Sequence, residues 1–239
     1  MPLFPRRLAP LLCILLLSVA TAASAASLIP GQVLTVALSE DQPGGEAARA
    51  TYFQNVFPMS QAAGMRELST FKVEQVLAGD GAPQGAGLYA WPDPAAVRAA
   101  RDNPRYVADY RPLRPAAWKQ LQALDLTVET PLELAIDRGR PHTLALVWLK
   151  DRAEYERYYA GTAGLRERLG TRTVLVLPAH RYEKLTEGEI DPPDLVVLLR
   201  WESAEAIDGY TRSEEFQAHR AHFERGVERL EWYRMGFWD

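Results

Sequence analysis

The stretch 195–223, LVVLLRWESAEAIDGYTRSEEFQAHRAHF, predicts a buried strand followed by two helices. Each helix would begin at a serine, a residue type that caps helix N-termini. Shifted back by 110 positions, so that Leu198 falls on Leu88, the stretch meets LYAWPDPAAVRAARDNPRY at 88–106 without a gap. The tryptophans of the two copies coincide, and four capping residue types take matching positions: Asp93, Asn103, Ser203 and Ser213. The chain therefore carries an internal repeat.

Both halves of the chain show the same order of elements. In the first half we expect strands at 33–38, 71–77 and 87–91, a helix at 46–63, a helical region after Asp93 and a last extended segment within 126–136. In the second half we expect strands at 142–149, 173–177 (continuing towards Tyr182), 195–201 and 231–238, helices at 151–169 and 203–223, and a turn at 188–193. Each half is β-α-β-β-α-β, the ferredoxin-like pattern. A slip in the alternation near Gln75 indicates a β-bulge.

Two such repeats in one chain predict the architecture. A four-stranded antiparallel sheet with both helices on one face leaves its other face bare, and two such sheets can cover each other. We therefore predict an α+β fold of two tandem ferredoxin-like repeats, residues 31–137 and 142–239, whose sheets cover each other within one chain. Residues 137–141 would link the repeats. The chain is then a pseudo-dimer, and in solution a monomer or a homodimer.

The first 25 residues have the pattern of a cleaved signal peptide. Arg6 and Arg7 precede an apolar run at 8–19, and Ala23-Ser24-Ala25 fits the small-x-small cleavage rule. A membrane anchor is the alternative, but the run is about a dozen residues, short of the ~20 that cross a bilayer. We expect a periplasmic or secreted protein. The only cysteine, Cys13, would leave with the signal, which excludes disulfides and a cysteine nucleophile in the mature chain.

Composition limits the class of partner. The net charge is −4 and charges of both signs are interspersed, which argues against a nucleic-acid partner. No phosphate loop or nucleotide-binding fingerprint stands out. We expect no membrane association after signal cleavage, and a small molecule as the ligand.

Ordered motifs in the second half carry a resemblance to a known family. They are Asp151-x-x-x-Tyr155, Gly170, Leu185-x-x-Gly188, Pro192-Pro193-x-Leu195-Val196-Val197 and Ser213-x-Glu215-Phe216-Gln217. Through them, residues 143–230 resemble the DUF1330 family of the dimeric α/β-barrel superfamily. Many members carry His-Gly-Gly where this chain has Arg168-Leu169-Gly170. The resemblance implies that the two repeats form an intramolecular dimeric α/β barrel. It leaves the activity open among cofactor-independent monooxygenases, lactone isomerases and haem-degrading or haem-binding proteins.

His180 and Tyr182 are the candidate catalytic pair. They lie two residues apart on an extended segment and so would share one sheet face. Facing a cavity between the sheets, they could move a proton. Alternatively, Pro178 ends the strand and both side chains face solvent at a rim.

The candidate ligand-binding residues are Arg200, Trp201, Tyr155 and His219. Arg200 would hold an anionic headgroup in the cavity mouth, or would pair locally with a carboxylate such as Glu202. The aromatic residues would line a pocket for an aromatic ligand, or simply pack a small core. His219 shares a helix face with His222, but no acidic helix-borne ligand accompanies them, so we predict no metal site.

Three functions follow as hypotheses. The first is binding of a small molecule in the barrel cavity, with one repeat keeping a pocket and the divergent first repeat serving as a lid. The second is cofactor-independent monooxygenase or isomerase chemistry on an aromatic or quinone-like substrate. The third is haem binding through a histidine. No cofactor is predicted for the preferred function.

Overall fold

The computed structural model describes residues 24–238. The expected signal peptide lies outside the described residues, apart from its last two positions. Within residues 24–238 no helix is long and apolar enough to cross a membrane.

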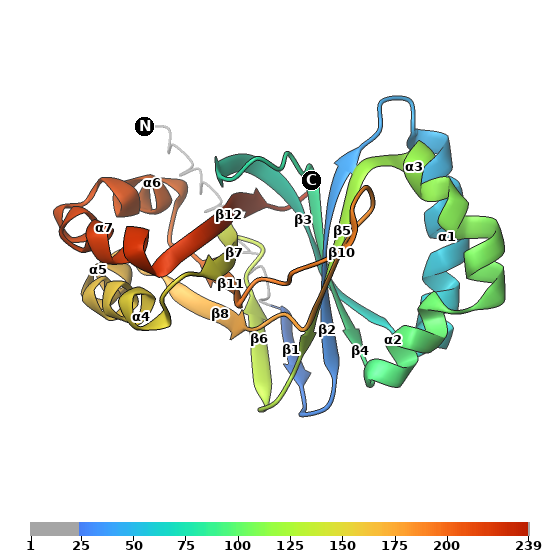
Figure 1. The fold of residues 1–239 in the computed structure, drawn as a ribbon, viewed down its shortest axis with the longest axis horizontal. Coiled ribbons are helices and arrows are strands. Elements are labelled where there is room, and N and C mark those ends of the chain that lie inside the picture. Colours follow the sequence, from blue (N-terminus) through green and yellow to red (C-terminus); the bar gives the residue numbers. More distant parts are fainter. Residues whose placement is uncertain (1–23, 239) are drawn as a thin grey trace, which may run out of the picture.

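The first repeat has the expected element order. Its four strands form a sheet in the order β5-β2-β4-β3, and helices cover one face of this sheet (Figure 1). The elements are β2 (Val33–Asp41), α1 (Glu46–Ala62), β3 (Arg66–Ala78), β4 (Gly85–Trp91), α2 (Pro94–Arg101), a π-helical turn (Tyr106–Tyr110), a 3₁₀ turn (Arg111–Leu113), α3 (Arg114–Ala117) and β5 (Trp118–Thr127).

The second repeat has the same strand order, β12-β7-β11-β8. Its elements are β7 (His142–Leu149), α4 (Arg152–Gly161), α5 (Ala163–Arg168), β8 (Arg172–Leu177), β9 (Arg181–Lys184), β10 (Gly188–Ile190), β11 (Leu195–Arg200), α6 (Ala204–Arg212), α7 (Glu214–Gly226) and β12 (Val227–Gly236). Equal strand order in both halves confirms the α+β fold of two tandem ferredoxin-like repeats.

Two seams join the repeats into one ten-stranded sheet. At the first, β3 pairs with β4 through its beginning and with β12 through its end. The pairing register with β12 skips Glu74, which confirms the bulge expected near Gln75. At the second seam, β9 and β10 of the second repeat extend the first sheet beyond β5. β8 and β9 together therefore correspond to the single long strand β3. β8 pairs with β11 as the beginning of β3 pairs with β4, and β9 pairs with β5 as the end of β3 pairs with β12.

Pro178 explains why the second seam uses two strands. Proline has no backbone N–H and cannot donate to a strand ladder. The segment 178–180 therefore interrupts the strand that we expected to continue from 173–177 towards Tyr182. After this interruption β9 joins the opposite sheet, so the barrel is closed by the chain itself.

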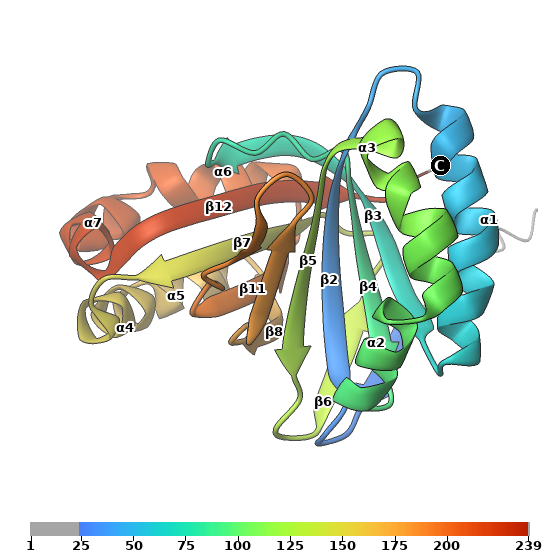
Figure 2. The same ribbon diagram turned by 45° about the vertical axis from the view of Figure 1, so that its right-hand side comes forward.

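The two sheets face each other, and the helices lie outside (Figures 1 and 2). The alternate residues that point between the sheets form the largest core, which takes side chains from both repeats. Leu34, Leu88 and Leu124 come from the first repeat, and Leu146 and Leu198 from the second. All five are at most 2% exposed. The interior of the barrel is thus packed with side chains. We expected a ligand cavity between the sheets, but the two apolar cavities lie between each sheet and its helices.

The capping residues behave as the sequence predicts. Asp93 accepts from the Ala96 N–H at 2.8 Å, and Ser213 accepts from the Phe216 N–H at 3.1 Å. Asn103 and Ser203 cap their helical segments in the same way. All four expected caps are confirmed.

Three element boundaries differ from expectation. The last strand of the first repeat, β5, begins at Trp118, well before 126–136, because its pairing with β2 runs back as far as Trp118, opposite Asp41. The rest of the expected segment is β6 (Leu132–Ile136), which pairs with β1 (Ser24–Leu28) in a separate ribbon. The expected turn at 188–193 begins with β10, and the expected helix at 151–169 is broken at Thr162.

Candidate functional site

Small side chains on one face of the first sheet make room for a cavity. Strand residues alternate between the two faces, so Ala86 and Leu88 enter the core while Gly85 and Gly87 face the helices. The neighbouring strands contribute small residues to the same helix-facing surface: Thr35, Ala37, Ser39 and Ala123. Helix α1 lies over this surface and cannot fill all of the space above it.

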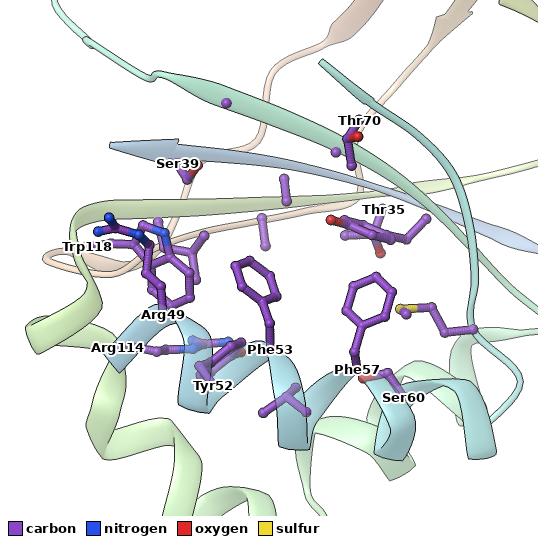
Figure 3. A pocket seen from close by; sticks show the side chains of 18 of the residues that line it. Thr35, Ser39, Arg49, Tyr52, Phe53, Phe57, Ser60, Thr70, Arg114 and Trp118 are labelled. Atoms are coloured by element: carbon purple, nitrogen blue, oxygen red, sulfur yellow. The ribbon is translucent and has the colours of Figure 1, made fainter. Parts of the chain in front are cut away.

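The result is a cavity of about 390 Å³, which we call the first-repeat cavity. Figure 3 shows Phe53 and Phe57 pointing from α1 into it, with Tyr52 and Trp118 at one end and Thr35 on the sheet side. Phe53 is 45% exposed, so the cavity opens to solvent beside it. Trp238 reaches the lining from the end of the second repeat.

The lining is mainly aromatic. Edge-to-face contacts hold the rings in place. The ring centroids of Tyr52 and Phe53 lie 5.0 and 5.7 Å from that of Trp118, and the centroid of Phe57 lies 5.9 Å from that of Tyr89. The Tyr89 ring lies directly over Gly87. A side chain at this position would collide with it, because an added Cβ would come within 2.4 Å of the Tyr89 hydroxyl. Such a chamber suits a flat apolar molecule.

Three arginines reach the lining, and two are fully engaged. Arg49 donates to the carbonyl of Ala117 at 2.9 Å and also pairs with Asp41 and Glu46. Arg101 makes a bidentate pair with Asp125 at 2.5 and 2.9 Å.

Arg114 differs from the other two. It pairs with Glu183 at 3.0 Å and lies over the Tyr106 ring. Its Nε atom is buried without a hydrogen-bond partner among the described residues.

Two tyrosine hydroxyls lie beside Arg114. The hydroxyls of Tyr52 and Tyr106 are 3.4 Å apart. Burial, reinforced by Tyr52, raises the pKa of Tyr106 well above its ordinary value, and burial, with Glu67, raises the pKa of Tyr89 to about 12. Tyr89 and Tyr106 therefore keep their protons at neutral pH and can donate a hydrogen bond.

The second repeat has a counterpart on its own helix-facing side, the second-repeat cavity, of about 220 Å³. It is smaller because larger side chains replace the small ones. Strand pairing matches Leu195 with Val147 where the first repeat matches Gly85 with Ser39. In the same way, Val197 takes the place of Gly87.

Both repeats share a buried hydrogen bond at the equivalent site. Trp91 donates through Nε1 to Thr35 at 3.1 Å, and Trp201 donates to Thr143 at 2.8 Å. Thr35 in turn donates to Asp125 at 2.7 Å. The match supports the repeat at the level of individual contacts.

A third, charged hollow lies beside the first-repeat cavity, between α2 and the strands β5 and β9. This arginine pocket, about 520 Å³, takes its charge from five arginines and four carboxylates: Arg98, Arg101, Arg111, Arg114, Arg181, Asp102, Asp125, Glu183 and Glu189. Arg101, Tyr106 and Arg114 line both spaces and so form their common wall.

The structure separates the two candidate catalytic residues. Tyr182 is 1% exposed in the core between the sheets, where its hydroxyl donates to Gln122. His180 is at the surface, where Nδ1 lies 3.0 Å from the Thr127 hydroxyl, and it lines the arginine pocket. The expectation that they face one cavity fails because the strand does not run through to His180: β9 starts at Arg181.

Of the four candidate ligand-binding residues, two are brought together. Trp201 and Tyr155 both line the second-repeat cavity. Arg200 lies 3.6 Å from Asp137, away from the described cavities. His219 packs against Gly161 and stacks near His222.

The histidines do not fit a histidine-ligated haem in either helix-side cavity. None of the four contributes to the lining of the first-repeat or second-repeat cavity. His142 is fully buried, with Nδ1 3.0 Å from the Arg140 carbonyl, and His222 contacts Glu154 at 2.8 Å. Within residues 24–238 there is also no group of three or more His, Cys, Asp or Glu side chains placed to hold a metal ion.

Sequence reasoning missed the first-repeat cavity. The signal was present in the stretch 85–91, GAGLYAW, where one glycine begins the strand expected at 87–91 and another lies two residues before it. A glycine in a strand interior often marks a place where something else approaches the backbone closely. We had interpreted this repeat as a lid, but it holds the larger cavity.

Comparisons with known structures support the fold. The chain is similar to a crystal structure of an anthrone oxidase-like protein, with a TM-score of 0.53 and 12% identity over 85% of this chain and 90% of that one. It is also similar to a mutant chlorite dismutase from Candidatus Nitrospira defluvii, with a TM-score of 0.52 and 10% identity over 87% and 93% of the two chains. No family model matches the chain, and no curated protein does. At this identity the likeness shows a shared fold of dimeric α/β-barrel type over nearly the whole chain.

Proposed function

We propose that this protein binds a flat, mainly apolar small molecule in the first-repeat cavity. The observation that carries the proposal is the aromatic chamber over a floor of glycine, alanine and serine. Its volume of about 390 Å³ is in the range of ligand pockets. Phe53 stands half exposed at its opening, where an apolar ligand would cover it.

The chemistry of the lining favours binding over acid–base catalysis. Its one carboxylate, Asp41, pairs with Arg49. The lining has no histidine or cysteine, and Tyr89 and Tyr106 keep their protons at neutral pH because burial raises their pKa values. A general base needs a pKa near the working pH, and neither of these two phenols meets that requirement.

The test fills the cavity with the residue that the second repeat uses. Gly85→Leu copies Leu195, and its Cβ would meet only Ser39 Oγ closely, at 3.1 Å. We expect the neutral fluorescent probe N-phenyl-1-naphthylamine to bind the wild-type protein and to lose at least tenfold in affinity in this variant. Ala145→Leu, which fills the second-repeat cavity instead, is the matched control and should bind as the wild type does. Equal binding by both variants would exclude the first-repeat cavity as the site.

The alternative is a cofactor-independent oxidation of an aromatic or quinone-like substrate. The similar structure described as anthrone oxidase-like favours this alternative. It predicts oxygen uptake when the protein is mixed with anthrone. No uptake above a protein-free control would remove it.

We also propose that the protein is exported and belongs near the DUF1330 family. Arg6, Arg7 and the apolar run at 8–19 support export, and the motifs of residues 143–230 support the kinship. The mature protein would meet its ligand in the periplasm or outside the cell, without nucleic acid or membrane as partner. Intact mass of the protein from its exported compartment should show loss of the first 25 residues, and a full-length mass would contradict export with cleavage.

A further inference from the structure

We infer that the ligand of the first-repeat cavity carries an acidic group, of the aromatic carboxylate class, which binds Arg114. This inference rests on the proposed function and adds the polar end of the ligand to it. Three features of the wall between the first-repeat cavity and the arginine pocket carry it: an underused guanidinium, a spare phenol hydrogen and a local excess of arginine.

The guanidinium of Arg114 has donors to spare. An arginine side chain has five N–H groups in a planar fork that matches a carboxylate. Glu183 accepts one hydrogen bond from Nη1, and the buried Nε has no acceptor among the described residues. Nη2 has no hydrogen-bond partner among the described residues, and the Arg114 side chain lines the cavity, so Nη2 is the donor that we assign to an acidic ligand. Arg49 and Arg101 have no comparable vacancy, since carbonyls and carboxylates already engage them.

The tyrosines beside Arg114 supply a second donor. When two hydroxyls share one hydrogen bond, one of the two hydrogens is left over. Tyr52 and Tyr106 form such a pair, at 3.4 Å. In the second repeat the corresponding network is closed within the protein: Tyr210 donates to Thr162 at 3.2 Å, and Arg166 donates to Thr162 at 2.6 Å. Among the described residues, a left-over hydroxyl hydrogen is therefore found at this place in the first repeat and not in the second, where the Tyr158 and Tyr210 hydroxyls also pair, at 2.7 Å.

The charges around the wall favour an anion. Arg101, Arg114 and Arg181 are balanced by Asp125, Glu183 and Glu189 through close pairs. Of the charges that remain around the pocket, Arg98 and Arg111 outnumber Asp102. Glu183 is the carboxylate with which an acidic ligand must compete, because it contacts Arg114 directly.

The experiment uses two planar molecules of nearly the same shape, 2-naphthoate and 2-naphthamide, as competitors of N-phenyl-1-naphthylamine on the full mature chain. We expect 2-naphthoate to bind at least tenfold more tightly than 2-naphthamide. Arg114→Gln should remove that preference and leave the affinity for 2-naphthamide within about twofold. Arg114→Lys, which keeps the charge but not the fork, should retain part of it. Arg220→Gln, at an exposed arginine of the second repeat that pairs with Glu224, should leave the preference intact.

Glu183→Gln gives the sharpest test, because it predicts a gain. Removing the competing carboxylate should tighten 2-naphthoate binding several-fold with little change for 2-naphthamide, a result that damage to the fold would not produce. If N-phenyl-1-naphthylamine binds but the two competitors bind equally, or if Glu183→Gln weakens 2-naphthoate selectively, the acidic-ligand inference is wrong while the cavity proposal stands. If the probe does not bind at all, the cavity proposal fails first.

Discussion

His142 is a histidine whose pKa depends on its burial in the packed barrel. Its ring is fully buried and lies 5.4 Å from Phe71 and 5.6 Å from Phe237. Burial lowers the pKa of His142 from its ordinary 6.5 to about 4, with Arg200 acting in the same direction and Asp137 and the Arg140 carbonyl opposing. The imidazole is therefore neutral in the folded protein at neutral pH.

The lowered pKa predicts acid sensitivity. The unfolded chain takes up a proton at His142 below about pH 6.5, and the folded chain does so only near pH 4, so stability falls between these values. The loss should reach about 2 kcal/mol by pH 5. His142→Leu, which copies Leu34 at the matching position of the first repeat, should show a shallower decline of Tm between pH 6.5 and 4.5. Parallel pH profiles for the two proteins would contradict a buried neutral imidazole.

At the scale of elements, the repeat is visible in how its helices begin and end. Gly64 and Gly170 follow the first helical segments of the two repeats with positive φ angles of 94° and 65°. Glycine takes this conformation at little steric cost, and it lets the chain turn from the helix into the next strand. The same glycine after the helix in both halves supports the correspondence of α1 with α4 and α5.

The caps give a direct prediction at this scale. The Ser213 hydroxyl accepts from the Phe216 N–H and donates to the Tyr210 carbonyl at 2.8 Å, so it joins the end of α6 to the start of α7. Ser213→Ala should lower the free energy of unfolding by about 1 kcal/mol, measured by urea denaturation. Ser213→Asp keeps an acceptor at the helix start and should recover part of the loss; equal stability of all three proteins would show that the cap contributes nothing.

At the scale of the whole molecule, the two repeats share one core and two seams. Leu124 of the first repeat and Leu146 of the second belong to the same buried cluster. The hairpin of β9 and β10 pairs with β5 across the second seam, so unfolding either half would expose the apolar face of the other.

This arrangement predicts unfolding in a single cooperative step. Leu124→Ala should cost about 2–5 kcal/mol and lower the single calorimetric transition as a whole. Val107→Ala, at a side chain that is 42% exposed, is the control and should change Tm little. Two separated transitions in the wild type or in Leu124→Ala would show that the repeats are independent domains.

The sequence alone determined the repeat, the order of elements and the helix starts. These features are local: an apolar alternation, a capping residue or a glycine after a helix acts on its own neighbours within a few residues. The same patterns sufficed to predict that two sheets cover each other. They did not place the end of the first repeat, because whether β5 or β6 completes its sheet depends on which distant strand each one pairs with.

Only the tertiary structure decided where a ligand fits. Alternation places two sets of side chains on opposite faces of a strand, but it does not say which face meets the other sheet and which meets the helices. Tyr182 and His180 were therefore expected together and lie apart. The small residues of 85–87 became a cavity floor because α1 and Trp238, both distant in sequence, close around them without filling the space. Whether the space over these small residues is filled depends on side chains from distant parts of the sequence. Their positions are set only by the tertiary fold.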